Sequence, residues 1–376
     1  MKMNYNSSIY NLYYEWWKNI DKFIFSLIIL LFVTGLFFSL LSTSLLVSDK
    51  LDTNDYAFFF KHLSFVFLGL VIIFMLSSIN EEKLFKISPV IFIISLVFLF
   101  LVPIIGIEVN SARRWLDFNI LPRFQPIELV KPFLIILISL ILSNEKYNNI
   151  YFKYLFSFLI TLVIGLLLAA QPDIGQTLLV FFSWSVLIFI SGINVIFLVI
   201  SCLILSVALY FSINLIPKFA YIKNRILSFF NTETGTHNAQ SEKAIDSITS
   251  GGFFGKGIGE GTLKNRVPEA HTDYIISVIS EEFGVIAIIL ILLMFLVLIY
   301  SVFKKINLGN KERTKLVLVG CVSLILLQAM IHIGVNIRLF PTTGMTLPFI
   351  SYGGSSIISI SILSGIILNL TKRRVS

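Results

Sequence analysis

The chain has 376 residues, of which 56% are hydrophobic and only 13% are charged, and its mean hydropathy is +0.90. Soluble domains carry about 25% charged residues, so this composition excludes a soluble globular protein and indicates a polytopic membrane protein. The formal net charge of +8 does not indicate a nucleic-acid partner, because basic loops at a membrane surface account for it.

Apolar runs predict an all-α fold of ten transmembrane helices. A helix needs about 20 apolar residues to cross the bilayer core. The predicted spans are 23–46, 58–79, 87–105, 127–143, 151–170, 174–191, 194–216, 273–303, 314–337 and 348–370. Residues 1–376 are expected to form one membrane domain, with tails at 1–22 and 371–376, an outer loop at 106–126 and a long outer loop at 217–272 between the seventh and eighth helices.

The distribution of basic residues predicts the orientation of these helices. An even number of spans puts both termini on one side of the membrane. The short segments on that side hold most of the basic residues outside the long loop, including Lys304, Lys305 and Arg373. Because positively charged loops stay in the cytoplasm, both termini are expected to be cytoplasmic. The two long loops then face outward.

The long outer loop contains three kinds of local pattern. Within 218–230, apolar residues recur at helical spacing between basic ones, which predicts an amphipathic helix in the outer membrane interface. Residues 240–250 are consistent with a second short helix. Six glycines lie in 251–261 and predict a tight connector, or backbone N–H groups that help to hold an anion. A nucleotide loop is disfavoured, because no Ser or Thr follows Lys256.

The stretch 266–284 carries the strongest candidate for a reactive group. Thr272 is a plausible N-cap, which would put Asp273 in the first turn of the eighth helix, near the positive end of its dipole. Glu281 and Glu282 follow about two turns below and are expected to support the helix. Ionisable groups within a membrane helix are costly and are therefore functional candidates. The alternative for Asp273 is a helix acid without a further role.

A second polar group straddles the entry to the fourth span. Arg123 and Gln125 precede this span, and Glu128 and Lys131 share one face of its helix. Glu128 and Lys131 either neutralise each other inside the bundle or belong to a basic pocket for phosphates, with Arg123 as a forked donor. The last span is preceded by a broken segment, 341–356, of the kind that is tolerated where it is buried or lines a cavity.

At this point the chain resembles the SEDS family (shape, elongation, division and sporulation) of bacterial peptidoglycan glycosyltransferases. The amino-acid sequence around 259–273 is more similar to the division-type than to the elongation-type members. One departure is Asn336-Ile337-Arg338, where the family tends to have small residues and glycine. The matching stretches run in family order over nearly the whole chain: Ala112-Arg113-Arg114-Trp115, Arg123-Phe124-Gln125-Pro126, Gln171-Pro172-Asp173, Ser250-Gly251-Gly252, Pro268-Glu269-Ala270-His271-Thr272-Asp273, Glu281-Glu282-Phe283-Gly284 and Ser351-Tyr352-Gly353-Gly354-Ser355.

The resemblance implies polymerisation of lipid II at the outer face of the bacterial cytoplasmic (inner) membrane. Asp273 matches the essential acid of the family, which acts as the general base on the acceptor 4-hydroxyl. Arg123 and Lys131 match basic residues that serve the donor pyrophosphate. Further substrate contacts are expected from Gln125, Glu128, Trp115, His271, Lys256 and Ser355. The implied partners are lipid II, a class B penicillin-binding transpeptidase, divisome proteins and membrane lipids.

The predicted position of Asp273 leaves its basicity open. A helix N-terminus lowers the pKa of a carboxylate, whereas a base for a sugar hydroxyl needs a raised pKa. Either burial raises the pKa again, or a divalent cation (Mg²⁺ or Mn²⁺) shares the site and activates the hydroxyl. The competing functions are a lipid II flippase, favoured by intramembrane charges and broken helices, and a scaffold that only recruits division proteins.

Overall fold

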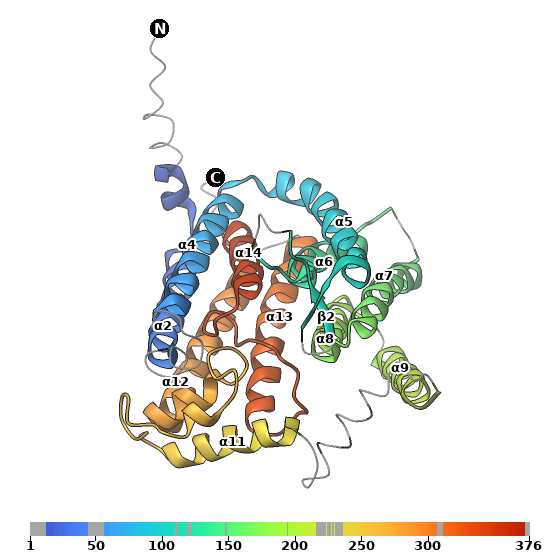
Figure 1. The fold of residues 1–376 in the computed structure, drawn as a ribbon. Helices are drawn as coiled ribbons and strands as arrows, with labels where there is room; N and C mark the ends of the chain where they lie inside the picture. The colour runs from blue at the N-terminus through green and yellow to red at the C-terminus, as the bar shows by residue number, and fades with distance from the viewer. Residues whose placement is uncertain are drawn as a thin grey trace.

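The computed structural model describes residues 13–43, 56–109, 112–118, 122–146, 149–193, 195–215, 223, 227, 229, 236–306 and 311–372. Within these residues, ten helices coincide with the ten predicted apolar segments (Figure 1). They are α2 (Lys22–Thr43), α4 (Ala57–Ser78), α5 (Glu81–Ile105), α6 (Pro126–Leu142), α7 (Ile150–Ala170), α8 (Ile174–Ile190), α9 (Val195–Leu215), α12 (Ile275–Ile306), α13 (Glu312–Asn336) and α14 (Gly354–Leu370).

The helices have the length and surface of membrane spans. Among the described residues, α2, α4, α5, α7, α12 and α13 are long and apolar enough to cross a bilayer, and α8 and α14 are shorter apolar helices. Large apolar side chains such as Phe67, Ile104 and Leu203 are exposed, as lipid-facing residues are. The chain is therefore a multi-pass membrane protein. The number of ten spans stays a prediction.

The interior of the bundle is formed around α13, α14 and α6. In its most apolar stretch α13 has 78% of its residues buried, against 22% for α4 and for α12, so α13 is central and the other two face outward. The buried residues of α14 run along its whole length. Its small side chains, many of them serines, allow α4 to pack closely against it, as the contact of Gly69 with Ser361 shows.

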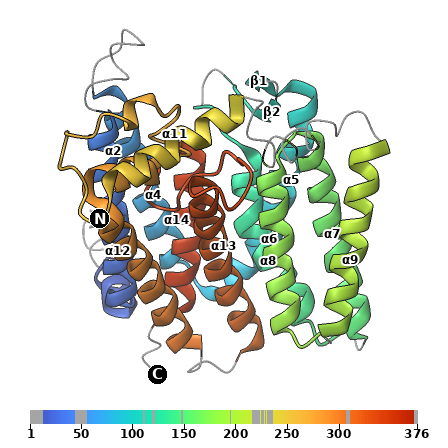
Figure 2. The ribbon, with the colours of Figure 1, turned by 90° about the horizontal axis from the view of Figure 1, so that it is seen from below.

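One end of the bundle carries additional structure (Figure 2). A short antiparallel hairpin, β1 (Ile107–Val109) and β2 (Ala112–Trp115), lies at this end within the predicted outer loop. Helix α11 (Thr236–Gly251) crosses the same end and is longer than the short helix predicted at 240–250. The amphipathic helix predicted at 218–230 lies outside the described residues, apart from single positions. The C-terminus lies at the opposite end of the bundle.

The start of the eighth apolar helix differs from the sequence prediction. Helix α12 begins at Ile275, and Asp273 lies in the turn before it, where its N–H donates to the carbonyl oxygen of Glu269 at 3.1 Å. Thr272 is not the N-cap, because its hydroxyl also donates to the carbonyl oxygen of Glu269, at 3.2 Å. The prediction of Thr272 as the N-cap was wrong because residues 269–274 already form hydrogen bonds with one another in turns.

Glu281 binds the glycine-rich loop as well as belonging to α12. Its carboxylate accepts hydrogen bonds from the N–H groups of Leu263 and Lys264, at 2.9 and 2.5 Å, and from the hydroxyl of Ser247, at 2.9 Å. The ammonium of Lys256 lies 3.6 Å away. The charge of this fully buried acid is thus compensated by the loop that it organises.

Glu282 holds the same loop through a second set of donors. It forms an ion pair with Lys264 and accepts a hydrogen bond from the N–H of Gly259 at 3.4 Å. The prediction that the two acids support the helix is therefore incomplete. They tie α12 to a loop that is distant in sequence.

A break in α12 at Gly284 allows the glycine-rich loop to approach the helix closely. Gly284 has φ 73° and ψ −177°, a conformation that is essentially restricted to glycine. A Cβ there would lie 2.1 Å from the carbonyl oxygen of Phe253 and 2.6 Å from the nitrogen of Gly255. The glycine-rich loop therefore packs its backbone directly against the backbone of α12.

Gly284→Ala should destabilise the protein strongly, because strain of about 1–3 kcal/mol adds to a backbone clash. Gly252→Ala is the matched control: Gly252 also has positive φ, +57°, but a Cβ there meets no atom within 4 Å. Thermal unfolding of both purified variants in detergent measures the difference. Equal losses of stability would contradict the proposed close packing.

The last apolar helix begins later than predicted, at Gly354 instead of residue 348. Residues 341–353 have no regular helix, as the predicted broken segment requires. Polar side chains of α13 hold this segment: Gln328 donates to the carbonyl oxygen of Thr346 at 3.1 Å, and Nδ1 of His332 lies 2.6 Å from that of Met345. Carbonyl oxygens of this non-helical backbone thus find hydrogen-bond partners inside the protein, as backbone at membrane depth must.

Candidate functional site

Asp273 lies where α12, α13 and the broken segment meet. Its carbonyl oxygen accepts a hydrogen bond from Asn336 Nδ2 at 3.0 Å, which fixes the turn to the end of α13. A Cβ placed on Gly344 would lie 3.4 Å from Asp273 Oδ2 and 3.8 Å from Arg114 Nη1. The carboxylate and a guanidinium therefore converge on the backbone of the broken segment.

Arg114 reaches this position because side chains alternate along a strand. Its neighbour Arg113 is exposed and pairs with Glu108 of the facing strand at 3.5 Å. The side chain of Arg114 is largely buried and donates to the carbonyl oxygens of Gln171 (3.3 Å) and Pro172. Its Nε also lies 3.8 Å from Asp173 Oδ2. The hairpin thus directs a fixed positive charge into the bundle.

Asp173 connects this cation to the fourth span. It is the N-cap of α8, where it accepts a hydrogen bond from the N–H of Gln176 at 3.4 Å. Its other oxygen accepts from Gln125 Nε2 at 2.9 Å. The N–H of Gln125 in turn donates to Ser355 Oγ at 3.0 Å. Two predicted site residues, Gln125 and Ser355, therefore lie in one network with Arg114.

The network continues inward to the predicted pair on α6. Gln176 Nε2 donates to Glu128 Oε1 at 2.8 Å, and the ammonium of Lys131 lies 2.8 Å from Glu128 Oε2 and 3.5 Å from Gln328 Oε1. Lys131 has no exposed surface, and Glu128 is also buried. The structure therefore shows a self-neutralising buried pair. Binding of the donor pyrophosphate by Lys131 stays a prediction.

The surroundings of Asp273 make it more basic than an ordinary carboxylate. Asp273 precedes the apolar helix, and burial raises the pKa of its carboxyl to about 7. The negative charges of Glu269 and Asp173 act in the same direction, and Arg114 opposes them. Burial thus outweighs the effect of the helix N-terminus, and Asp273 can accept a proton near neutral pH.

His271 stays next to this acid as a neutral ring. Burial lowers its pKa, although the charge of Glu269 partly offsets the shift. Its ring packs against Phe58 and Tyr352, with centroid distances of 5.2 and 6.1 Å. Its carbonyl oxygen accepts a hydrogen bond from the N–H of Tyr352 at 3.1 Å. These contacts hold the turn before α12 against α4 and the broken segment.

Three other predicted site residues have partners of their own. Arg123 has a 65% exposed side chain that pairs with Asp117 at 2.8 Å. Trp115 is half-buried at the end of β2, opposite Ile107. Lys256 is exposed on the glycine-rich loop and pairs with Glu281. No hydrogen bond or ion pair found among the described residues joins these three side chains to Asp273.

The divalent cation expected beside Asp273 stays a prediction. The part of the chain that the structure describes contains no cluster of three or more His, Cys, Asp or Glu side chains arranged to hold a metal ion. Arg114 supplies positive charge that acts on Asp273.

Sequence reasoning missed the roles of Arg114, Glu269 and Asn336. Strand alternation indicates that Arg113 and Arg114 face opposite sides, but it does not tell which of them faces inward. Glu269 acts on Asp273 only because the turn folds back, and Asn336 bonds to a residue that is distant in sequence. The departure at Asn336 was visible in the sequence, although its contact was not.

Comparison with known proteins places these features in a family. The family model described as "Cell cycle protein", which covers FtsW, RodA and SpoVE proteins, matches residues 21–375. A protein of Caulobacter vibrioides named "Probable peptidoglycan glycosyltransferase FtsW" is 30% identical over 96% of this chain and 91% of its own length. The protein of the same name from Wigglesworthia glossinidia brevipalpis is 34% identical over 90% of both chains.

Solved structures agree with this assignment. A chain from the structure "Structural coordination of polymerization and crosslinking by a peptidoglycan synthase complex" aligns with a TM-score of 0.76 and 24% identity, over 94% of this chain and 97% of the other. The rod shape determining protein RodA of Thermus thermophilus aligns with a TM-score of 0.68 and 25% identity, over 94% of this chain and 96% of that one.

The fold and site define a polytopic membrane protein in which the carboxylate of Asp273 and Arg114 of a buried polar network converge on the broken segment. The motifs that carry the resemblance are present, and the family match extends over almost the whole chain. The protein belongs to the SEDS family, the group of FtsW, RodA and SpoVE.

Proposed function

We propose that this protein polymerises lipid II, with Asp273 as the general base. The relatives named peptidoglycan glycosyltransferase FtsW, and the family to which the chain belongs, make it a peptidoglycan glycosyltransferase of the division type. The observation that carries the assignment to Asp273 is its pKa of about 7 at a position where its carboxylate and Arg114 converge. A group with this pKa can remove a proton at neutral pH and release it again.

In the proposed reaction, Asp273 takes the proton of the acceptor GlcNAc 4-hydroxyl. The hydroxyl oxygen then forms a bond to C1 of the donor MurNAc, while the bond from C1 to the pyrophosphate oxygen breaks. The configuration at C1 inverts, and undecaprenyl pyrophosphate leaves with the bonding electrons. Arg114 supplies fixed positive charge beside the base, and Arg123 and Lys131 are proposed to serve the leaving group.

The proposed orientation puts Asp273 on the periplasmic side of the inner membrane. It is supported by the basic residues at the ends of α12 and α14, and by the position of α11 and the hairpin at the opposite end. The partners are proposed to be a class B penicillin-binding transpeptidase, which would crosslink the new strands, and divisome proteins. The transpeptidase is supported by the name of one structural relative, a peptidoglycan synthase complex that couples polymerization and crosslinking.

Purified protein with fluorescent lipid II tests the proposal, with and without the partner transpeptidase and with a chelator in a parallel reaction. Long glycan strands on a gel are expected, and loss of this product in the chelator would support the predicted divalent cation. Reconstituted protein that moves lipid II across vesicles without polymerising it would support a flippase instead. Neither activity, combined with full complementation by Asp273 variants in cells, would support a scaffold.

A further inference from the structure

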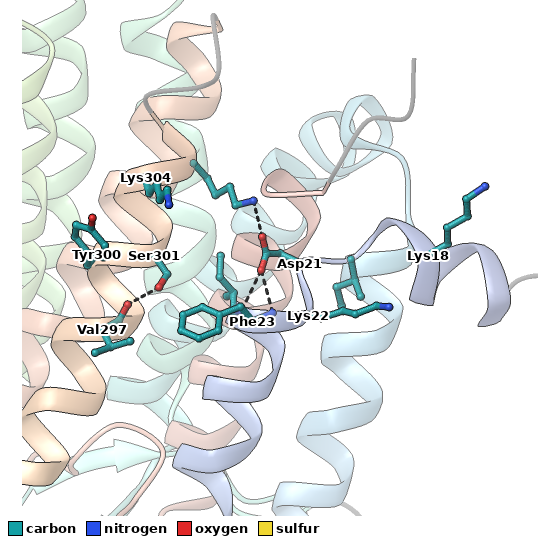
Figure 3. Close-up of a pocket in the computed structure, with 11 residues that line it drawn as sticks. Lys18, Asp21, Lys22, Phe23, Val297, Tyr300, Ser301 and Lys304 are labelled. Carbon is teal, nitrogen blue, oxygen red and sulfur yellow. Dashed lines mark hydrogen bonds and ion pairs between the residues drawn. The ribbon is translucent and has the colours of Figure 1, made fainter.

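A basic pocket lies at the end of the bundle opposite Asp273. Asp273 precedes the first residue of α12, whereas Lys304 and Lys305 lie in its last turn. A helix of 32 residues spans about 48 Å, so the two positions belong to opposite membrane faces. The pocket has a volume of about 640 Å³ and lies between the last turns of α12 and the start of α2 (Figure 3).

An ion pair belongs to the lining of this pocket. Lys305 Nζ lies 2.7 Å from Asp21 Oδ2. The other oxygen of Asp21 accepts hydrogen bonds from the N–H groups of Phe23 and Ile24, both at 3.1 Å, and so caps α2. Burial raises the pKa of Asp21, but the bonds from Lys305 and from these N–H groups outweigh it, and the pKa lies below its ordinary value. Asp21 therefore stays charged, and both of its carboxylate oxygens already have partners.

Three further lysines in the pocket have no counter-ion in the part of the chain that the structure describes. Lys18, Lys22 and Lys304 line it and are exposed, and no ion pair to any of them is found among the described residues. In Figure 3, Lys304 lies on the α12 side of Asp21, and Lys22 and Lys18 extend on the other side. Among the described residues that line the pocket, Asp21 is the only one with a carboxylate. The pocket therefore has an excess of positive charge that would attract a phosphate.

The other walls of the pocket are those of a lipid site. Phe23 and Val297 line it and are 57% and 39% exposed, and Tyr300 is 70% exposed. Towards the middle of the bilayer, Leu293 and Leu296 of α12 continue this exposed apolar surface. A soluble phosphate compound would gain nothing from these side chains. A phospholipid could place its phosphate among the lysines and its acyl chains along α12.

Aromatic residues put the pocket at the level of the headgroups. Tyr13, Tyr14 and Trp17 precede α2 and are exposed, as is typical of the belt at a membrane–water interface. Trp16 Nε1 donates to Ser77 Oγ at 2.7 Å and fixes this segment against the end of α4. The ammonium of Lys22 lies 5.4 Å from the centre of the Trp17 ring. The lysines thus lie at the depth of lipid phosphates.

We propose that the pocket between α2 and α12 binds the phosphate headgroup of an anionic phospholipid from the membrane leaflet opposite the Asp273 site. Basic pockets between transmembrane helices bind anionic lipid headgroups in this way. The lipid would join the first helix of the bundle to the helix that begins at the proposed catalytic site. The site does not depend on the identity of the sugar substrate.

Native mass spectrometry of the purified full-length protein tests this site. It is titrated with phosphatidylglycerol, with phosphatidylcholine and with glycerol 3-phosphate. The protein is expected to bind phosphatidylglycerol with clear preference over both. Because each lysine near the surface contributes about fivefold to binding, replacing Lys18, Lys22 and Lys304 by Gln together should weaken it roughly 100-fold.

The matched control replaces Lys83, Lys86 and Lys315 by Gln, which removes the same charge from the starts of α5 and α13 at the same end of the bundle. This variant should bind phosphatidylglycerol as the unchanged protein does. The single variant Lys304→Glu repeats the test if the triple variant cannot be purified. Equal losses in pocket and control variants, unchanged binding by the pocket variants, or equally tight binding of phosphatidylcholine would overturn the proposal. Binding of glycerol 3-phosphate as tight as that of the lipid would assign the pocket to a soluble phosphate compound instead.

Discussion

Asp273→Asn is expected to lower the rate of lipid II polymerisation by about 10²–10⁴-fold, the usual contribution of a general base. The amide keeps the size of the side chain but cannot accept the proton. Asn336 bonds to the backbone of residue 273, so the turn before α12 should remain in place. Initial rates with fluorescent lipid II measure the effect, and thermal unfolding shows whether the variant is folded.

Asp246→Asn is the matched control for this substitution. Asp246 is an exposed acid on α11, at the same end of the bundle, and it should retain the unchanged rate. Asp273→Glu should keep part of the activity, because it retains a base at a shifted position. Glycan strands made at the normal rate by folded Asp273→Asn would remove Asp273 from the mechanism.

Lys131→Met is expected to destabilise the protein by about 3–5 kcal/mol, because it leaves the charge of Glu128 buried without a partner. The double variant Glu128→Gln with Lys131→Met removes both charges and should recover most of this loss. Unfolding of the single and double variants in detergent measures the coupling. Equal stability of the single variant and the unchanged protein would show that the buried pair is not formed.

The same double variant separates stability from activity. A folded double variant that makes glycan strands would limit Lys131 to a structural role. A folded double variant without activity would support the predicted role of Lys131 at the donor pyrophosphate. The ion pair seen in the structure fits both outcomes, because a buried lysine can exchange Glu128 for a phosphate when substrate enters.

The sequence predicted the membrane helices because the signal for each of them lies within one continuous stretch of the chain. Apolar runs of sufficient length define the helices, and ten such runs coincide with described helices. The precise ends were less predictable, since they depend on contacts between distant segments. Helix α12 begins at Ile275 and breaks at Gly284 because the glycine-rich loop and the turn at 269–274 pack against it. The hairpin of β1 and β2 was also missed, because two short strands give no clear pattern.

The candidate site could be predicted only in part. The motifs singled out Asp273, Gln125 and Ser355, and the structure connects the latter two to Asp173 beside Arg114. The pKa of Asp273 could not be predicted, because it depends on burial and on Glu269, Arg114 and Asp173. These groups meet only in the folded chain. Arg123 and Lys256 matched the family motifs equally well, yet the structure places them in other contacts.

The pH dependence of the initial polymerisation rate tests the central claim most directly. The base is active when deprotonated, so the rate should fall tenfold per pH unit below the pKa of Asp273, about 7, and level off above it. Glu269→Gln removes a neighbouring negative charge and should move the inflection to lower pH, with little change in the plateau. A rate that is flat through pH 7, or an inflection that Glu269→Gln leaves in place, would contradict the assignment of Asp273 as the base.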